Sequence, residues 1–276
     1  MAFDRSDNLY VVDAKVSLVY KFDSAGHLLL KFGGPGAGKG QFQFYEAAGY
    51  YSGYIAIDSH GDLYVTDLAN YRVQKFDSNG KFLLAWGKQG DGPGELNEPY
   101  GVSVDAKDQV YVSEALGTRV QIFDANGKYL RVIEPPKSSS VASSRWMVNA
   151  VDRDGNLYVG KFDTSLLKFD PSGKPVDKWG DRLWRVYQRQ NINQLSVDRE
   201  GNLYVSDTDA RVVKINPAGE VLGMVPYAGG DPYGIEATGS VMDSHGQVYV
   251  SYHNTVSETG ASAIYVYQAS DFMPMP

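Results

Sequence analysis

The chain has 276 residues, of which 43% are hydrophobic, a length and composition that suit one closed domain with a sizeable core. Its net charge of −7 argues against broad binding to nucleic acids or to anionic membranes. No apolar run reaches the length of about 18 residues needed to cross a membrane, and the absence of cysteine excludes disulfide bonds and thiol chemistry.

The first repeat, residues 1–42, has room for only a stub of its first strand before Asp4. The second repeat, residues 53–94, shows the pattern most clearly. It has four short runs of strand-forming residues, separated by turns rich in Gly, Asn, Asp and Ser. The runs are 54–58, 63–67, 72–77 and 82–86, and their spacing predicts a four-stranded antiparallel meander.

One anchor identifies the copies of this unit: an Asp followed six residues later by a Tyr. The anchors recur every 45 to 54 positions, at Asp4/Tyr10, Asp58/Tyr64, Asp105/Tyr111, Asp152/Tyr158, Asp198/Tyr204 and Asp243/Tyr249. This period, with four strands per repeat, is typical of a β-propeller blade. We therefore expect an all-β, single-domain, six-bladed propeller with blades near residues 1–42, 53–94, 100–136, 147–183, 193–225 and 233–270.

The last repeat lacks an obvious fourth strand, because its predicted strands (240–243, 247–251 and 263–268) are followed only by the segment DFMPMP. We expect that the missing outer strand lies upstream of Met1 in a longer protein. The alternative is a natural three-stranded final blade.

Residues 53–94 resemble the NHL repeat almost throughout, including Asp67, Asn70 and Arg72, and residues 100–136 also match well. The later repeats match it in their first two strands. The resemblance implies a propeller that presents its loops to a protein, peptide or glycan, as a sensor or scaffold. It also implies two alternatives, because similar propellers include metal-dependent lyases and lactonases, and some NHL propellers bind RNA.

Several motifs favour a structural interpretation. Gly33–Gly40 imitates a phosphate loop, but no helix follows it, so we interpret it as a crossing between blades. Asp152–Asn156 is weakly similar to a calcium loop and occupies the position of a hairpin turn. The pairs Asp67/Arg72, Glu114/Arg119 and Asp207/Arg211 are interpreted as structural ion pairs.

The crossings and the loops between second and third strands are long and variable, so we expect function on that face. These segments are rich in Tyr, Trp and Arg, which dominate binding hot spots. Trp184 with Arg185 and Arg189 is the preferred ligand platform. The full set of candidate ligand-binding residues is Tyr51, Tyr100, Arg145, Trp146, Trp184, Arg185, Tyr187, Arg189, Asn193, Tyr233 and His253.

A metal site is not favoured. Three of the four histidines (His27, His60 and His245) fall on the opposite face, which leaves only His253 for a zinc site on the loop face. The positions five residues before each anchor Asp should approach the mouth of the central channel. These are Gly53, Tyr100, Met147, Asn193 and Thr238, with Asn149 and Asn191 nearby but no clear carboxylate partner for calcium.

We therefore predict a binding module without catalytic residues, because no Ser, His and Asp can be grouped from the sequence. No cofactor is predicted, and calcium is the alternative at the channel mouth. A metal-assisted lyase or lactonase-like hydrolase and an RNA-binding propeller remain open as alternatives. The composition indicates an extracellular or cell-envelope location. The resemblance implies a protein, peptide or glycan as the partner.

Overall fold

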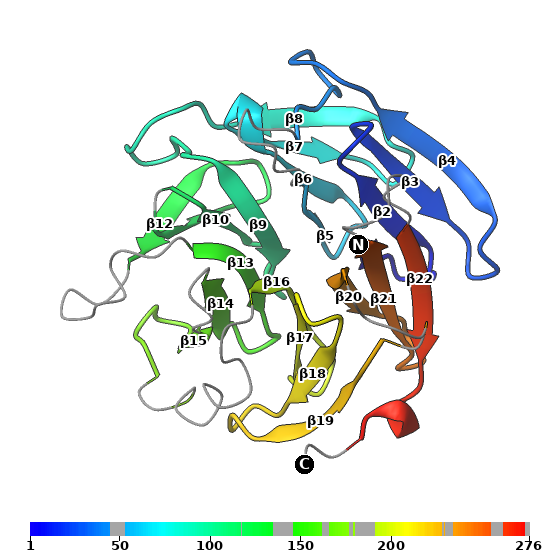
Figure 1. Ribbon diagram of the computed structural model, residues 1–276. Coiled ribbons are helices and arrows are strands. Elements are labelled where there is room, and N and C mark those ends of the chain that lie inside the picture. Colours follow the sequence, from blue (N-terminus) through cyan, green and yellow to red (C-terminus); the bar gives the residue numbers. More distant parts are fainter. Residues whose placement is uncertain are drawn as a thin grey trace. The chain divides into compact units, whose positions relative to one another are not determined.

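The computed structural model describes residues 1–44, 53–116, 118–134, 146–161, 166–176, 179, 191–227, 229, 234–254 and 262–273. The chain forms two compact units, Met1–Met147 and Val148–Pro276, and each is described by itself. Every sheet consists of strands that follow one another in the sequence and pair with antiparallel neighbours (Figure 1).

Unit 1 holds three four-stranded sheets. Sheet 1 contains β1 (Ala2–Phe3), β2 (Leu9–Asp13), β3 (Leu18–Phe22) and β4 (Leu28–Gly33). Sheet 2 contains β5 (Ile55–Ile57), β6 (Leu63–Asp67), the 3-10 turn η1 (Leu68–Asn70), β7 (Arg72–Phe76) and β8 (Phe82–Trp86). Sheet 3 contains β9 (Pro99–Val104), β10 (Val110–Glu114), β11 (Val120–Phe123) and β12 (Tyr129–Ile133). The predicted meander in residues 53–94 and the short first strand of the first repeat are confirmed.

Unit 2 begins within the first strand of sheet 4, which contains β13 (Trp146–Val151), β14 (Leu157–Lys161) and β15 (Leu166–Phe169). Sheet 5 contains β16 (Ile192–Val197), β17 (Leu203–Asp207), β18 (Val212–Ile215) and β19 (Val221–Val225). Sheet 6 contains β20 (Ile235–Met242), β21 (Val248–Asn254) and β22 (Ser262–Tyr267), followed by the 3-10 turn η4 (Ala269–Asp271).

Sheets 4 and 6 each have three strands among the described residues, as predicted for the last repeat. In sheet 4 a single bridge between Pro175 and Phe169 stands where a fourth strand would begin. After β22 the chain does not turn back onto its own sheet. Met273 instead pairs with Met224 of β19 through two backbone hydrogen bonds, so the segment after η4 extends the edge of sheet 5.

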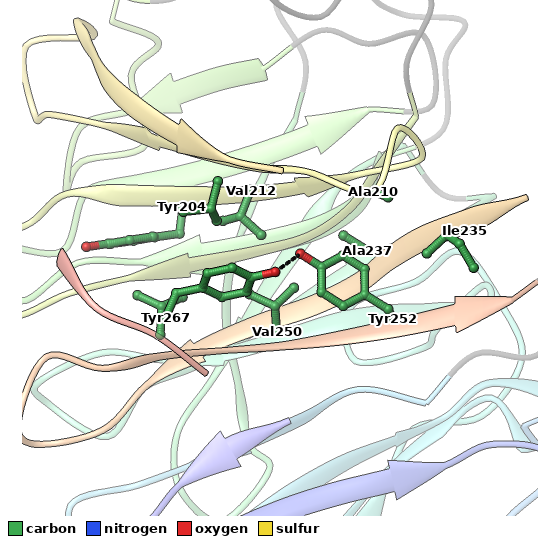
Figure 2. Packing of buried hydrophobic residues seen from close by; sticks show 10 residues of the cluster. Tyr204, Ala210, Val212, Ile235, Ala237, Val250, Tyr252 and Tyr267 are labelled. Carbon is green, nitrogen blue, oxygen red and sulfur yellow. Dashed lines mark hydrogen bonds between the residues drawn. The ribbon is translucent and has the colours of Figure 1, made fainter. Parts of the chain in front are cut away.

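The core lies between neighbouring sheets. The second strands β6, β10 and β17 are buried at every position, whereas the fourth strands β4 and β8 alternate between more and less exposed side chains. One apolar cluster fills the space between sheets 1 and 2, another that between sheets 2 and 3, and a third that between sheets 5 and 6 (Figure 2). A sheet that must bury both faces needs second strands such as LYVTD, which explains their continuous apolar composition.

The anchor Asp and Tyr meet in space, and a Lys from the third strand joins them. In sheet 2, Asp58 Oδ1 accepts two turn N–H groups and Asp58 Oδ2 accepts the Tyr64 hydroxyl at 2.9 Å. The Tyr64 hydroxyl and Lys75 Nζ both also lie 3.3 Å from the carbonyl oxygen of Ala125, in the β11–β12 turn of sheet 3. We call this Asp–Tyr–Lys group the turn latch, because it binds one sheet to a turn of the next.

The turn latch recurs along the chain. In sheet 1, Tyr10 and Lys21 donate to the carbonyl oxygen of Ser78 in sheet 2 at 3.1 and 3.3 Å. In unit 2, Lys168 of sheet 4 donates to the carbonyl oxygen of Pro217 in sheet 5 at 3.0 Å. Sheets 3 and 6 lack the Lys, because Tyr111 pairs with Ile122 and Tyr249 with Val266, whereas Tyr64 pairs with Lys75. The Tyr249 hydroxyl is 3.5 Å from the side chain of Gln247.

Each latched turn also carries a glycine on which an aromatic side chain of the preceding sheet packs. A Cβ built on Gly80 would lie 2.6 Å from the ring of Phe32, and one on Gly127 would lie 2.6 Å from the indole of Trp86. Both glycines also have left-handed backbone angles, with φ of 75° and 78°. The sequence pattern DxxGK therefore serves two purposes at once: the turn and the contact between sheets.

We expect Gly127→Ala to destabilise the protein more than Gly26→Ala. Gly26 has a similar φ of 81° but no atom within 4 Å of an added Cβ, so its replacement costs only backbone strain of about 1–2 kcal/mol. Gly127→Ala adds an overlap with Trp86 of about 1–3 kcal/mol. Urea unfolding midpoints of the two variants measure the difference. Equal midpoints would show that the contact between Gly127 and Trp86 is loose.

Candidate functional site

Antiparallel order divides the two ends of each sheet. At one end the first strand begins, the second strand ends and the third begins (Figure 1). In the four-stranded sheets the fourth strand also ends there, so the crossing to the next sheet leaves from this end. We call this the loop end, and the opposite end, which holds the latched turns, the turn end. In sheet 2 the loop end includes Tyr54, Asp67, Arg72 and Trp86. It is the end on which the sequence predicted function.

A buried carboxylate organises the loop end of sheet 2. The side chain of Asp67 is fully buried, and Arg72 Nε lies 2.7 Å from its Oδ2. The same carboxylate accepts hydrogen bonds from Asn70 Nδ2, Gln74 Nε2 and the backbone N–H of Gln43. The predicted ion pair is confirmed, and it belongs to a larger group that we call the loop clamp.

The loop clamp holds the crossing that arrives from sheet 1. Arg72 donates to the carbonyl oxygens of Gly38 and Gln41 at 2.8 and 2.9 Å. Gln74 donates to the same Gln41 oxygen and accepts from the Gly40 N–H. The Gly36 N–H bonds to the Phe42 carbonyl oxygen. These contacts occupy the groups that a phosphate would need, which confirms that Gly33–Gly40 is a crossing.

Sheet 3 repeats the loop clamp with a Glu. The side chain of Glu114 is fully buried, and its Oε1 lies 2.8 Å from Arg119 Nε and 2.7 Å from Gln121 Nε2. Arg119 and Gln121 both donate to the carbonyl oxygen of Glu95 in the crossing from sheet 2. The Asn97 N–H bonds to Glu114 Oε2, as the Gln43 N–H bonds to Asp67 in sheet 2.

Sheet 5 has the acid and the Arg but lacks the glutamine. Asp207 Oδ2 lies 2.6 Å from Arg211 Nε, and Asp207 is fully buried. Val213 stands at the strand position that Gln74 occupies in sheet 2, because it pairs with Val205 as Gln74 pairs with Val65. Burial raises the pKa of the Asp207 carboxyl to about 6, against the lowering effect of Arg211.

Sheet 6 replaces the loop clamp with tyrosines. Tyr252 follows its anchor at the same distance as Asp67, and its ring lies 4.8 Å from Tyr227 in the crossing from sheet 5. Tyr265, at the position of Gln74, lies 5.4 Å from Tyr227. The hydroxyls of Tyr252 and Tyr267 are 3.0 Å apart (Figure 2), and the Tyr267 hydroxyl donates to the Pro226 carbonyl oxygen. Burial raises the pKa of Tyr252 well above its usual range.

A β-bulge stands at the same place in the first strand of three sheets. In sheet 5, Ile192 pairs with Asp207 and Gln194 with Ser206, so Asn193 is the extra residue. Thr238 is the extra residue in sheet 6, and in sheet 3 the bulge falls at Tyr100 and Gly101. A bulge turns a side chain out of the ladder and is common beside binding sites. These are three of the five positions that the sequence placed near a channel mouth.

Hydroxyl groups on the second strand accept hydrogen bonds from the backbone at the start of the first strand. The Tyr54 N–H bonds to Thr66 Oγ1 at 3.1 Å, and the Gly101 N–H bonds to Ser113 Oγ at 3.1 Å. Thr66, Ser113, Ser206 and Ser251 each lie eight residues after their anchor Asp. The sequence analysis missed this recurring Ser or Thr, although its fixed spacing could have revealed it.

Two of the predicted site residues lie on such first strands. In unit 1 the ring of Tyr100 lies 5.0 Å from the ring of Tyr54, and both are partly exposed. In unit 2 the Asn193 side-chain amide donates to the Ala237 carbonyl oxygen at 3.1 Å. Each residue contacts the neighbouring sheet of its own unit.

Unit 2 also gathers uncharged polar groups around Gly239. Thr238 Oγ1 and Ser251 Oγ are 2.9 Å apart. A Cβ built on Gly239 would overlap Gln194 Oε1 and would lie 3.3 Å from Ser251 Oγ. We call Asn193, Gln194, Thr238 and Ser251 the amide–hydroxyl patch. Thr238 is exposed and the other three are partly exposed.

The histidines lie where the sequence placed them. His27, His60 and His245 are in turns at the turn end, and His253 is in β21 near the loop end. His253 Nδ1 is 3.2 Å from Ser262 Oγ, and its strand partner is Glu236.

The expectation that no Ser, His and Asp could be grouped is wrong at one turn end. Ser59 Oγ donates to Asp108 Oδ2 at 2.7 Å, and His60 Nδ1 lies 3.3 Å from Ser59 Oγ and 3.4 Å from Asp108. One ring nitrogen faces both partners and the hydroxyl proton points to the acid. His60 therefore cannot take a proton from Ser59 while Asp108 orients its other nitrogen.

The same turn brings together three metal-ligand groups. Ligand atoms of Asp58, His60 and Asp108 lie within 4.8 Å of one another. Lys75 Nζ, however, is 3.4 Å from Asp58 Oδ2, and Asp108 Oδ1 accepts the Ser59 N–H. The ammonium already supplies the positive charge that a cation would bring, so these carboxylates fit a structural role. The Asp152–Asn156 turn is likewise structural, because Asp152 accepts two turn N–H groups, the Asn156 amide and the Tyr158 hydroxyl.

Most of the predicted aromatic and basic site residues lie outside the described residues. These are Tyr51, Arg145, Trp184, Arg185, Tyr187, Arg189 and Tyr233. Trp146 contributes its backbone to β13. Tyr100, Asn193 and His253 are the predicted site residues whose side chains are described, and the structure does not bring all three into one unit.

Comparisons with known proteins support the fold. A family model described as DUF5128, a six-bladed β-propeller, matches residues 55–173, less than half of the chain. A Staphylococcus aureus virginiamycin B lyase, solved as a catalytically inactive variant with quinupristin, is similar with a TM-score of 0.62 at 12% identity. The alignment covers 95% of this chain and 82% of that one.

Two further solved structures have the same fold. A streptogramin B lyase has a TM-score of 0.59 at 14% identity, with 97% of this chain and 81% of that chain covered. A protein of unknown function from Bacteroides caccae has a TM-score of 0.68 at 11% identity, with 96% and 90% covered. A search of curated proteins gives no match.

The fold is therefore an all-β, six-bladed β-propeller built of antiparallel blades, as the sequence predicted. The finer assignment to NHL repeats stays a prediction. In the described part of the chain, no helix has the length and apolar character to span a membrane.

We expect Asp67→Asn to destabilise unit 1 by about 3 kcal/mol, because it leaves Arg72 without its buried charge partner. The matched control is Lys88→Ala, which removes an ion pair with Glu95 whose Lys side chain is 76% exposed and should cost less than about 1 kcal/mol. Denaturant unfolding compares the two variants. A similar small loss in both would mean that the loop clamp contributes little.

The raised pKa of Asp207 predicts a specific pH dependence. Its folded-state pKa of about 6 lies above the usual value near 4, so the folded protein holds this proton more tightly than the unfolded chain. The contribution of this bound proton to the free energy of unfolding is fully present below pH 4 and is lost as the pH rises through 6. The free energy of unfolding of the wild type relative to Asp207→Asn should fall across this interval. A flat difference from pH 4 to 7 would contradict the assignment.

Proposed function

We propose that this propeller is a binding module that uses the loop ends of its blades, and that it carries no catalytic residues of its own there. The observation that carries the proposal is the repeated β-bulge, which turns Tyr100, Asn193 and Thr238 out of the ladders at one end of their sheets. The bulges recur at one position while the residues on them differ, as expected when the backbone is structural and the side chains are selected for contacts.

The carboxylates of the two loop clamps in unit 1 already have structural partners. Asp67 and Glu114 are fully buried, and their carboxylate oxygens accept hydrogen bonds from Arg, Gln and backbone N–H groups of the loop clamps. A carboxylate so engaged has little capacity left to act as a base or to hold a metal. This supports binding over acid–base chemistry among the described residues. The lyases of the same fold share too little sequence to transfer their activity.

The partner that we propose is a protein, peptide or glycan, as the resemblance to NHL repeats implies. Partly exposed tyrosines support this choice, because Tyr54 and Tyr100 in unit 1, and Tyr227 and Tyr265 in unit 2, offer rigid amphipathic surfaces. RNA is the weaker alternative, since the net charge is −7. A metal-assisted lyase or hydrolase is the alternative if a metal is held by residues outside the described part of the chain.

A ligand screen with site mapping tests the proposal. Neutral oligosaccharides, peptides of either charge and single-stranded RNA are added to the labelled protein, and backbone amide shifts are recorded. We expect a hit to move amides at the loop ends, with Tyr100→Ala or His253→Ala weakening binding about tenfold and the turn-end control His27→Ala leaving it unchanged.

The alternatives have distinct outcomes. A hit whose affinity falls steeply with salt would favour RNA binding. One tightly held metal ion per chain after dialysis would favour the metal-assisted enzyme. Hits that move only turn-end amides would overturn the proposal.

A further inference from the structure

The amide–hydroxyl patch in unit 2 joins Ser251, the hydroxyl that recurs on second strands, to polar side chains at positions that are not polar in every repeat. The positions of Gln194 and Thr238 within their repeats are filled by Tyr54 and Tyr100 in sheets 2 and 3 of unit 1. Ser240 is fully buried, whereas the equivalent position holds Ile55 in sheet 2. Since Tyr or Ile stands at these three strand positions in unit 1, the fold does not require Gln194, Thr238 and Ser240 there.

The polar groups converge at Gly239, which is buried and follows the exposed Thr238 in β20. Gln194 Oε1 occupies the place that a Cβ of residue 239 would fill, with Ser251 Oγ beside it, and Thr238 Oγ1 is 2.9 Å from Ser251 Oγ. Behind them the fully buried hydroxyls of Ser206 and Ser240 form a hydrogen bond of 2.9 Å. Hydroxyl groups thus extend from the exposed Thr238 into the space between sheets 5 and 6.

The charge and hydrogen-bonding groups of the patch indicate which class of ligand it can bind. All four members are uncharged, and each side chain can both donate and accept hydrogen bonds. A charged ligand would lose hydration here without gaining an opposite charge from these four side chains. A ligand with several adjacent hydroxyl groups can donate to and accept from each member, and a planar amide can bridge two such hydroxyls.

We propose that the amide–hydroxyl patch binds an uncharged saccharide, and this inference rests on the proposed binding function. Gly239 is the specificity feature, because any larger residue would displace the Gln194 amide from the place that it occupies beside Ser251. Asn193, held by the Ala237 carbonyl oxygen, fixes the spacing between β16 and β20 at the edge of the patch.

Gly239→Ala is the decisive variant. The backbone of Gly239 is outside the left-handed region, and the overlapped atom is the end of a flexible side chain, so the variant should fold normally. Its methyl group would displace Gln194. The second variant, Thr238→Val, keeps the shape of the side chain and removes its hydroxyl. The control is Ser244→Ala, at the turn end of the same sheet.

An array of neutral oligosaccharides supplies the probe, and the hit is titrated by NMR against the wild type and the three variants. We expect at least tenfold weaker binding for Gly239→Ala and several-fold weaker binding for Thr238→Val. Ser244→Ala should change the dissociation constant less than twofold, and the thermal unfolding of all three variants should stay close to that of the wild type.

The outcomes separate this inference from the proposed function. A saccharide whose affinity is unchanged by Gly239→Ala and Thr238→Val, or the absence of any saccharide hit, overturns the inference. A peptide that moves the Tyr100 or His253 amides but not the patch also overturns it and leaves the proposed function standing. If no class of ligand moves any loop-end amide, both fail.

Discussion

The structure depends on buried carboxylates whose oxygens are all engaged in hydrogen bonds or ion pairs. Asp58 ties sheet 2 to sheet 3 through Tyr64 and Lys75, and Asp67 ties the arriving crossing to sheet 2 through Arg72. Each oxygen accepts several donors, which is the condition under which a buried charge is tolerated. Because these groups fix both ends of the sheet, the residues that can differ between repeats are those whose side chains make no such contacts.

The repeat was predictable because its signals are local. The anchor spacing and the turn glycines fall within one repeat, so the sequence predicted six blades and the absence of a fourth strand in the last. The partners of the anchors were not predictable in the same way. Nothing near Tyr64 in the sequence indicates that its hydroxyl reaches the carbonyl oxygen of Ala125 in the next sheet. The acid–Arg pairs were predicted, whereas Gln74 and Gln121, which complete the clamps, were not.

The candidate site was predictable only in part, for a related reason. Counting from the anchor located Tyr100, Asn193 and Thr238, but the bulges that distinguish them depend on pairing with the second strand. Composition drew attention to aromatic and basic crossings and away from neutral residues such as Gln194 and Gly239. Gln194 and Gly239 lie far apart in the sequence, so their contact could be recognised only once sheets 5 and 6 were seen to pack together.

Departures from the repeat are the most informative feature of unit 2. Sheet 5 has Val213 where sheet 2 has Gln74, and sheet 6 has Tyr252 where sheet 2 has Asp67. An aromatic cluster holds the crossing there without charge, since Tyr227 packs on Tyr252 and Tyr265. Because aromatic contacts hold this crossing, sheet 6 needs no buried carboxylate at the position that Asp67 occupies in sheet 2. The first strands β16 and β20 carry the neutral side chains Asn193, Gln194 and Thr238, which can recognise hydroxyl groups because each both donates and accepts hydrogen bonds.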